Sequence, residues 1–188
     1  ALEHVYVSSH PRVVPHNAIQ LVSRRAHHLG VNGVSGNLSP SADLATQLVL
    51  YRAFPGSGVV AHTPPEYATS WAQARRPIPC FGTTHADYFH GPVPVTGVMA
   101  DGEIASEYEK NTGHAIVRAF EKVDYASVPA VLVANHGPFA WGPDPAAAAH
   151  NAVITEAVAR MAYRTATLSP AAGEGGRGLH DKPKLRKH

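Results

Sequence analysis

Hydrophobic residues in the first half of the chain recur with helical spacing in two stretches. Leu44, Leu48 and Tyr51 fall on one face of a helix predicted over residues 41–53. A second helix is predicted over residues 65–74, where a proline stands at an early position that needs no backbone donor. The stretch between them contains proline and glycine, which ends the first helix.

Two short apolar runs, at residues 59–61 and 131–133, are typical of buried strands. Residues 18–28 are compatible with a short helix, and residues 5–7 with a strand. Strands separated by helical stretches indicate an α/β layer architecture. Periodicity leaves open whether the sheet is parallel or antiparallel.

The second half of the chain contains two longer helical stretches. Residues 101–122 predict a helix with a break at Gly113. Asp144 and Pro145 are a cap and a first-turn proline, and they open a helix that runs to about residue 165. The residues expected on its buried face are Ile154, Ala157, Val158 and Met161.

Composition narrows the class of protein. The 188 residues, 44% of them hydrophobic, suit one compact domain over residues 1–188, with a glycine-rich and basic segment at 171–188 that predicts a flexible tail. A net charge of +2 does not indicate nucleic-acid binding. No apolar run reaches the roughly 18 residues of a membrane span, and the first residues lack a secretory pattern. With Cys80 as the single cysteine, we expect a soluble, cytoplasmic protein without a membrane partner.

Two histidines stand at the ends of the two predicted strands. His62 follows residues 59–61, and His136 follows residues 131–133 with two residues between. Ligand sites of α/β proteins lie at strand ends, and two imidazoles brought together there could hold a divalent metal. The alternative is that each is an ordinary histidine at the end of a strand, because most histidines bind nothing.

Four motifs carry a resemblance to a known family. In chain order they are Leu-Tyr-Arg-Ala-Phe-Pro at 50–55, Ala-Thr-Ser-Trp-Ala-Gln-Ala at 68–74, Gly-Thr-Thr-His-Ala-Asp-Tyr-Phe-His-Gly at 82–91 and Asn-His-Gly-Pro-Phe-Ala-Trp-Gly at 135–142. Their order and spacing resemble the bacterial L-ribulose-5-phosphate 4-epimerases of the class II aldolase family. The resemblance is clear over residues 40–161 and poor over residues 1–34.

The resemblance implies a fold, an assembly and a metal. The fold is a three-layer α/β/α sandwich around a largely antiparallel sheet, and the assembly is a homotetramer with active sites between subunits. The family holds a zinc-like divalent ion, with Mn²⁺ as an alternative to Zn²⁺, through three histidines. His62 and His136 match two of them, and Pro64 stands at the third position, where it cannot bind a metal.

The resemblance also implies roles for polar residues. Asp87 matches an acid/base aspartate. Asp43, which the resemblance also implies to be catalytic, matches an acidic position that holds aspartate in the epimerases and glutamate in the aldolases. Ser41 matches a serine that contacts phosphate, although its partner position is Ala42. The family's phosphate loop is resembled by a segment that contains Gly36, Asn37 and Ser39. The alternative is that this segment is a plain polar turn.

Three functions fit this pattern. The first is a metal-dependent sugar-phosphate epimerase, which converts L-ribulose 5-phosphate to D-xylulose 5-phosphate by cleaving and remaking a carbon–carbon bond. The second is a class II aldolase of the fuculose or rhamnulose phosphate type. The third is a non-catalytic relative, because Pro183 matches a family histidine and the family's second acid/base, a tyrosine near the C-terminus, lies beyond the last residue given.

Overall fold

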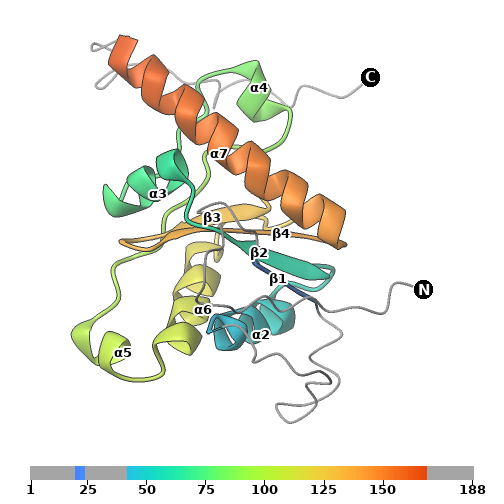
Figure 1. Ribbon diagram of the computed structural model, residues 1–188, viewed down its shortest axis with the longest axis vertical. Helices are drawn as coiled ribbons and strands as arrows, with labels where there is room; N and C mark the ends of the chain where they lie inside the picture. Colours follow the sequence, from blue (N-terminus) through green and yellow to red (C-terminus); the bar gives the residue numbers. More distant parts are fainter. Residues whose placement is uncertain (1–19, 24–41, 169–188) are drawn as a thin grey trace, which may run out of the picture.

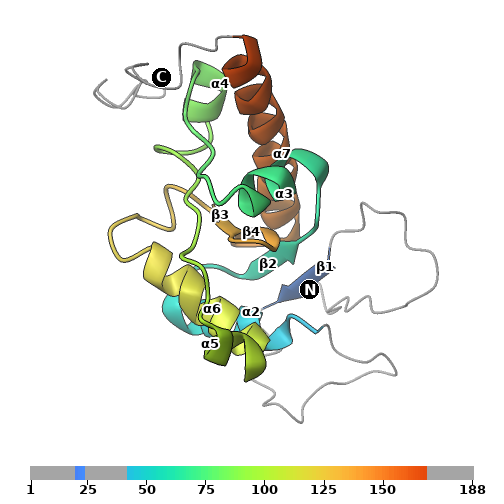
Figure 2. The same cartoon turned by 90° about the vertical axis from the view of Figure 1, so that its left-hand side faces the viewer.

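The computed structural model describes residues 20–23 and 42–168 of the chain. A four-stranded sheet lies between two layers of helices, with α2 and α6 on one side and α3 and α7 on the other (Figures 1 and 2). The prediction of a three-layer α/β/α sandwich is therefore confirmed for the described residues. The residues 171–188 expected to form a tail, and residues 5–7, lie outside them.

The sheet has the strand order β1-β2-β4-β3, and every neighbouring pair is antiparallel. The strands are β1 (Gln20–Ser23), β2 (Val59–His62), β3 (Ala130–Val133) and β4 (Gly137–Gly142). The expected antiparallel sheet is thus confirmed. The helix expected over residues 18–28 is wrong, because the backbone of β1 pairs with the edge of β2, a long-range contact that a local apolar pattern does not reveal.

Strand β4 was missed because its sequence resembles a turn. It contains Gly137, Pro138 and Gly142, yet it lies between β2 and β3 in the middle of the sheet. A side chain at Gly142 would put its Cβ only 2.6 Å from the backbone nitrogen of Ala148, at the start of α7 (Pro145–Leu168). Glycine therefore stands there because strand and helix approach closely, and not because the chain turns.

One face of the sheet is covered by α2 (Leu44–Ala53) and α6 (Tyr108–Ala119), with α5 (Asp101–Ala105) leading into α6. The predicted break at Gly113 is wrong, because α6 runs through that residue. The break lies instead at Ser106 and at Glu107, whose φ is +32°. Gly113 serves packing: a Cβ there would lie 2.7 Å from the Cβ of Val49 in α2.

The opposite face is covered by α7 and by α3 (Glu66–Gln73), with the short α4 (Thr83–Ala86) beyond them. The predicted cap is confirmed, since Asp144 Oδ1 accepts a hydrogen bond from the backbone N–H of Ala147. The predicted face of α7 is confirmed at Val158, which is buried, and at Ile154, which is half-buried and packs against the core. It is wrong at Met161, which is 40% exposed. The residues that α7 does bury are Ala148, Thr155, Val158, Ala159 and Ala162.

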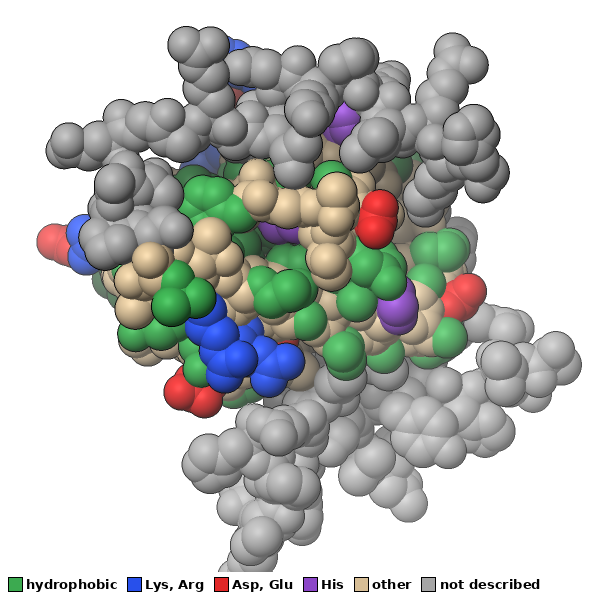
Figure 3. All heavy atoms as spheres, turned by 90° about the horizontal axis from the view of Figure 1, so that it is seen from above, with side chains coloured by type: hydrophobic (Ala, Val, Ile, Leu, Met, Phe, Trp, Pro, Cys, Tyr) green, Lys and Arg blue, Asp and Glu red, His purple; other side chains and the backbone are tan. Residues whose placement is uncertain are grey.

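The surface of α7 carries exposed hydrophobic side chains, among them Val153 and Tyr163. Seen from above in Figure 3, hydrophobic side chains lie at the surface between separate charged groups. Within residues 20–23 and 42–168, no helix combines the length and apolar character needed to cross a membrane.

A candidate metal centre at the end of strand β2

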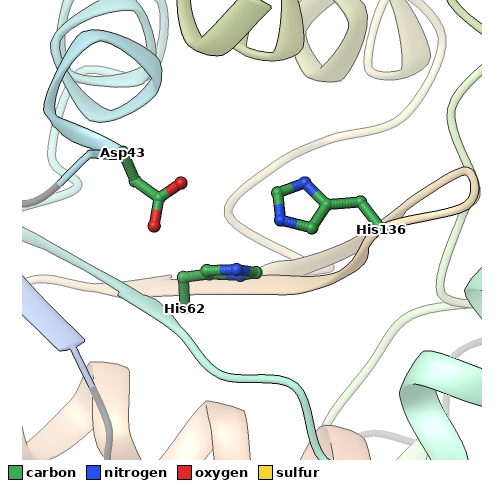
Figure 4. A group of neighbouring side chains, drawn as sticks. All are labelled: Asp43, His62 and His136. Carbon is green, nitrogen blue, oxygen red and sulfur yellow. The ribbon is translucent and has the colours of Figure 1, made fainter. Parts of the chain in front are cut away.

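Three side chains that can bind a metal meet at the end of β2 (Figure 4). They are Asp43, His62 and His136, and their ligand atoms all lie within 4.8 Å of one another. Each of the three residues is half-buried and so remains partly accessible to solvent. The site thus brings together groups separated by up to 93 positions in the sequence.

His62 is the last residue of β2, and its ring is fixed on two sides. Its Nδ1 lies 2.9 Å from the carbonyl oxygen of Pro138 in the neighbouring strand. The ring also stacks on Phe139, with ring centroids 4.0 Å apart and an angle of 14° between the planes. Because a carbonyl oxygen can only accept a hydrogen bond, Nδ1 carries the proton and Nε2 keeps a free lone pair, as a metal ligand must.

His136 lies in the short turn between β3 and β4. Its Nδ1 is 3.5 Å from the hydroxyl oxygen of Tyr108, the first residue of α6. Figure 4 shows one ring nitrogen of His136 directed toward Asp43 and His62, while the other points away from both. The two imidazole rings have centroids 4.8 Å apart and an angle of 69° between their planes, so their edges converge.

The turn that presents His136 is held in place from α3. Asn135 has a φ of +63°, a left-handed conformation in which asparagine is among the better tolerated residues. Its backbone N–H donates to the carbonyl of Ala72, and its side-chain Oδ1 accepts a hydrogen bond from Nε of Arg75, both at 3.0 Å. These bonds fix the direction in which the next residue, His136, leaves the turn.

Asp43, which was expected to be a catalytic residue, lies close enough to the two imidazoles to be a ligand as well. It occupies the cap position before α2 without making a side-chain cap hydrogen bond, and its oxygens face the two rings (Figure 4). Burial, and secondarily the neighbouring His62, lower the pKa of His136, while Asp43 and Glu109 act in the opposite direction. The lowered pKa favours the neutral imidazole, which is the form that binds metal.

The donor set suits a transition metal. Two imidazoles and one carboxylate are the ligands of many zinc sites, whereas calcium and magnesium prefer oxygen ligands alone. Pro64 is exposed and offers no donor, so Asp43 is the third side chain that these residues provide. Three protein ligands leave a coordination position for water or substrate, as in catalytic zinc sites.

The other predicted site residues are not brought to this group. Asp87 is exposed and ends α4, which lies on the α7 side of the sheet, whereas Asp43 opens α2 on the other side (Figures 1 and 2). Ala42 is also exposed. Pro183 lies outside the described part of the chain. The predicted phosphate-contacting residues also lie outside it, namely Gly36, Asn37, Ser39 and Ser41.

Tyr108 is a residue of this site that the sequence did not reveal. It stands at the start of a helix that follows a break, and no motif singles it out. Only the fold places its hydroxyl beside His136.

The chain is similar in sequence to known proteins. The family model described as "Class II Aldolase and Adducin N-terminal domain" matches residues 13–163, which extends the match into the region before residue 35. L-ribulose-5-phosphate 4-epimerase UlaF of Salmonella paratyphi B is 46% identical over 155 residues, which are 82% of this chain and 68% of that protein.

Solved structures show the same fold. An L-fuculose 1-phosphate aldolase superposes with a TM-score of 0.56 at 25% identity, over 75% of this chain, and this chain spans 59% of the aldolase. The L-fuculose-1-phosphate aldolase of Thermus thermophilus gives a TM-score of 0.52 at 17% identity, over 75% of this chain and 69% of that one. The chain belongs to the class II aldolase and adducin N-terminal domain family.

Proposed function

We propose that the chain is a metal-dependent sugar-phosphate epimerase that converts L-ribulose 5-phosphate to D-xylulose 5-phosphate. One observation carries the proposal: Asp43, His62 and His136 converge in a chain that is 46% identical to a protein named as that epimerase. The ion proposed for this site is Zn²⁺, because the donor set contains two imidazole nitrogens.

The reaction explains why a metal site is needed. The carbon whose configuration changes carries no acidic hydrogen, so removing a proton there cannot invert it. Cleavage of the bond between C3 and C4 gives the enediolate of dihydroxyacetone and glycolaldehyde phosphate. If the aldehyde rotates before the bond forms again, C4 is inverted and no atom is gained or lost. A bound divalent ion would supply the Lewis acidity that stabilises the enediolate.

The residues of the chain divide this work between holding the ion and moving a proton. Asp43, His62 and His136 hold the ion, and the carbonyl of Pro138 fixes His62 for that purpose. Cleavage requires the C4 hydroxyl to lose its proton, and attack on the other face of the aldehyde returns one. We assign this proton transfer to Asp87, whose carboxylate is exposed at the end of α4.

Asp87 would reach the metal site of a neighbouring copy. Within one chain it lies on the other side of the sheet from α2, which starts at the metal site (Figures 1 and 2). An oligomer, which we propose to be a homotetramer, would bring the two together, because each copy then supplies Asp87 to one site and ligands to another. Exposed hydrophobic side chains in α7 and just after α4, such as Val153 and Tyr88, support contact between copies.

An aldolase activity is the second candidate, because the superposed solved structures are named as aldolases. The two activities share the cleavage step and differ in the fate of the aldehyde. An epimerase retains and recaptures it, whereas an aldolase releases it.

The test is to incubate the purified chain with Zn²⁺ or Mn²⁺ and L-ribulose 5-phosphate, and to follow the products by NMR. We expect D-xylulose 5-phosphate to form, and we expect its formation to stop in His136→Gln. Free dihydroxyacetone and glycolaldehyde phosphate would show an aldolase instead. If the metal-bound chain forms no product from L-ribulose 5-phosphate, L-fuculose 1-phosphate or L-rhamnulose 1-phosphate, it is a non-catalytic relative.

A further inference from the structure

We propose that Tyr108 is the positioning residue of His136: its hydroxyl oxygen accepts a hydrogen bond from Nδ1–H of His136 and so leaves the Nε2 lone pair for the ion. This inference rests on the proposed metal site. It assigns a role to a residue that touches neither the ion nor the substrate.

The contact joins two separate parts of the fold. Tyr108 opens α6, while His136 lies in the turn between β3 and β4. The hydroxyl oxygen is 3.5 Å from Nδ1, and the two rings have centroids 6.1 Å apart. A divalent ion bound at Nε2 would withdraw electron density from the ring and make Nδ1–H a stronger donor, so we expect this long contact to shorten in the metal-bound protein.

The two histidines have partners of different chemical kinds. The partner of His62 is the carbonyl of Pro138, which accepts only and therefore allows one tautomer. The partner of His136 is a hydroxyl, which can donate or accept. Before metal binds, Nε2 of His136 can carry a proton toward the carboxylate of Asp43. Once Nε2 binds the ion, the proton belongs on Nδ1, and the same hydroxyl can then accept it.

The backbone on both sides of this contact is constrained. Tyr108 directly follows Glu107 and His136 directly follows Asn135, and both preceding residues have positive φ angles, of +32° and +63°. Non-glycine residues keep this conformation only where the surroundings enforce it. The conformation of Asn135 is held by its hydrogen bonds with the Arg75 side chain and the Ala72 carbonyl. The fold thus holds a left-handed backbone conformation at the two residues that precede these side chains.

The first experiment measures zinc affinity by competition with a chelator, in the wild-type chain and in two variants. Tyr108→Phe removes only the hydroxyl. Tyr163→Phe is the matched control, because Tyr163 is a 53% exposed tyrosine of α7, on the other side of the sheet from α6. We expect Tyr108→Phe to weaken zinc binding by roughly 10–100-fold and Tyr163→Phe to leave it unchanged.

The second experiment separates positioning from packing. Nitrogen-15 NMR of the zinc-loaded wild-type chain should show His136 with a proton on Nδ1 that exchanges slowly with water. Zinc bound through Nδ1 would overturn the proposal, even if Tyr108→Phe fails to fold. Equal zinc affinity of Tyr108→Phe and the wild type would also overturn it, while leaving the metal site standing. A wild-type chain that binds no zinc would overturn the metal site and the role of Tyr108 together.

Discussion

The chemistry of the site depends on how single nitrogen atoms are directed. Two rings offer Nε2 to a common point because each Nδ1 has a partner, the Pro138 carbonyl for His62 and the Tyr108 hydroxyl for His136. In the proposed metal site, Asp43 would supply a negative charge to balance that of a divalent cation. We therefore expect that removing any of these groups weakens metal binding.

The lowered pKa of His136 gives a prediction about pH. Its usual pKa is 6.5, and burial lowers that value in the folded chain. As pH falls below 6.5, the unfolded state takes up the proton first, so metal-free stability should decrease until the lowered pKa is reached and then show no further change from this group. Urea unfolding of the wild type and His136→Gln, compared from pH 8 to pH 5, measures the difference. A difference in stability between the two that is independent of pH would contradict the assignment.

The residues of the site were identified from the sequence to different extents. His62 and His136 were identified because they stand at the ends of short apolar runs, and the structure brings them together. Asp43 was identified from a motif, but its position beside the histidines depends on α2 beginning close to the end of β2. Tyr108 could not be found, because its contact with His136 spans 28 positions and depends on a break in the helix before it.

At the scale of elements, close packing between elements can override the local preferences of single residues. Gly113 was predicted to break a helix, since glycine has a low helix propensity. It lies inside α6 because α2 approaches so closely that no side chain fits. In the same way, the glycines and the proline of β4 suggest a turn, although these residues form a strand in the middle of the sheet. In contrast, β2, β3, α3 and the cap of α7 follow local patterns and were predicted.

Gly113→Ala should destabilise the chain, although alanine favours helices. The new Cβ would lie 2.7 Å from the Cβ of Val49 and 3.0 Å from the carbonyl oxygen of Thr46. Overpacking typically costs about 1–3 kcal/mol, which outweighs a propensity gain of about 1 kcal/mol. Gly102→Ala in α5 is the control, because its Cβ would meet nothing within 4 Å. If thermal unfolding shows Gly113→Ala to be as stable as Gly102→Ala, the close approach of α2 and α6 is wrong.

Glu156 of α7 caps a different helix. Its two carboxylate oxygens accept hydrogen bonds from the backbone N–H groups of Tyr67 and Ala68, at 3.0 and 2.8 Å, in the first turn of α3. Hydrogen bonds to a charged group contribute about 1.5–3 kcal/mol, so Glu156→Ala should lower the free energy of unfolding by about that amount. Glu121→Ala, at an exposed position, should change it little. Equal denaturation midpoints for the two variants would show that Glu156 does not hold α3.

At the scale of the whole molecule, the sheet separates two groups assigned to one reaction. Asp87 directly follows α4 on the α7 side, and the three candidate ligands lie where α2 begins (Figures 1 and 2). This separation is the structural reason to expect that active sites are shared between copies. The sequence implied such an assembly only through its resemblance to a family.

Shared sites predict that two inactive variants restore each other. Asp87→Asn and His136→Gln should each lack activity when purified alone. When the two are unfolded together and refolded, some sites combine an intact Asp87 with an intact ligand set, and random mixing in a symmetric oligomer should return roughly a quarter of wild-type activity. A mixture that stays inactive, although the variants assemble with each other, would place Asp87 and the metal site within one chain.

The location of bound zinc tests the central claim most directly. Crystals of the chain grown with zinc and measured at its absorption edge would show the ion in an anomalous difference map. We predict one strong peak at roughly 2.0–2.2 Å from Nε2 of His62, Nε2 of His136 and a carboxylate oxygen of Asp43. A map with no peak among these three side chains, or with zinc bound only elsewhere, would contradict the account.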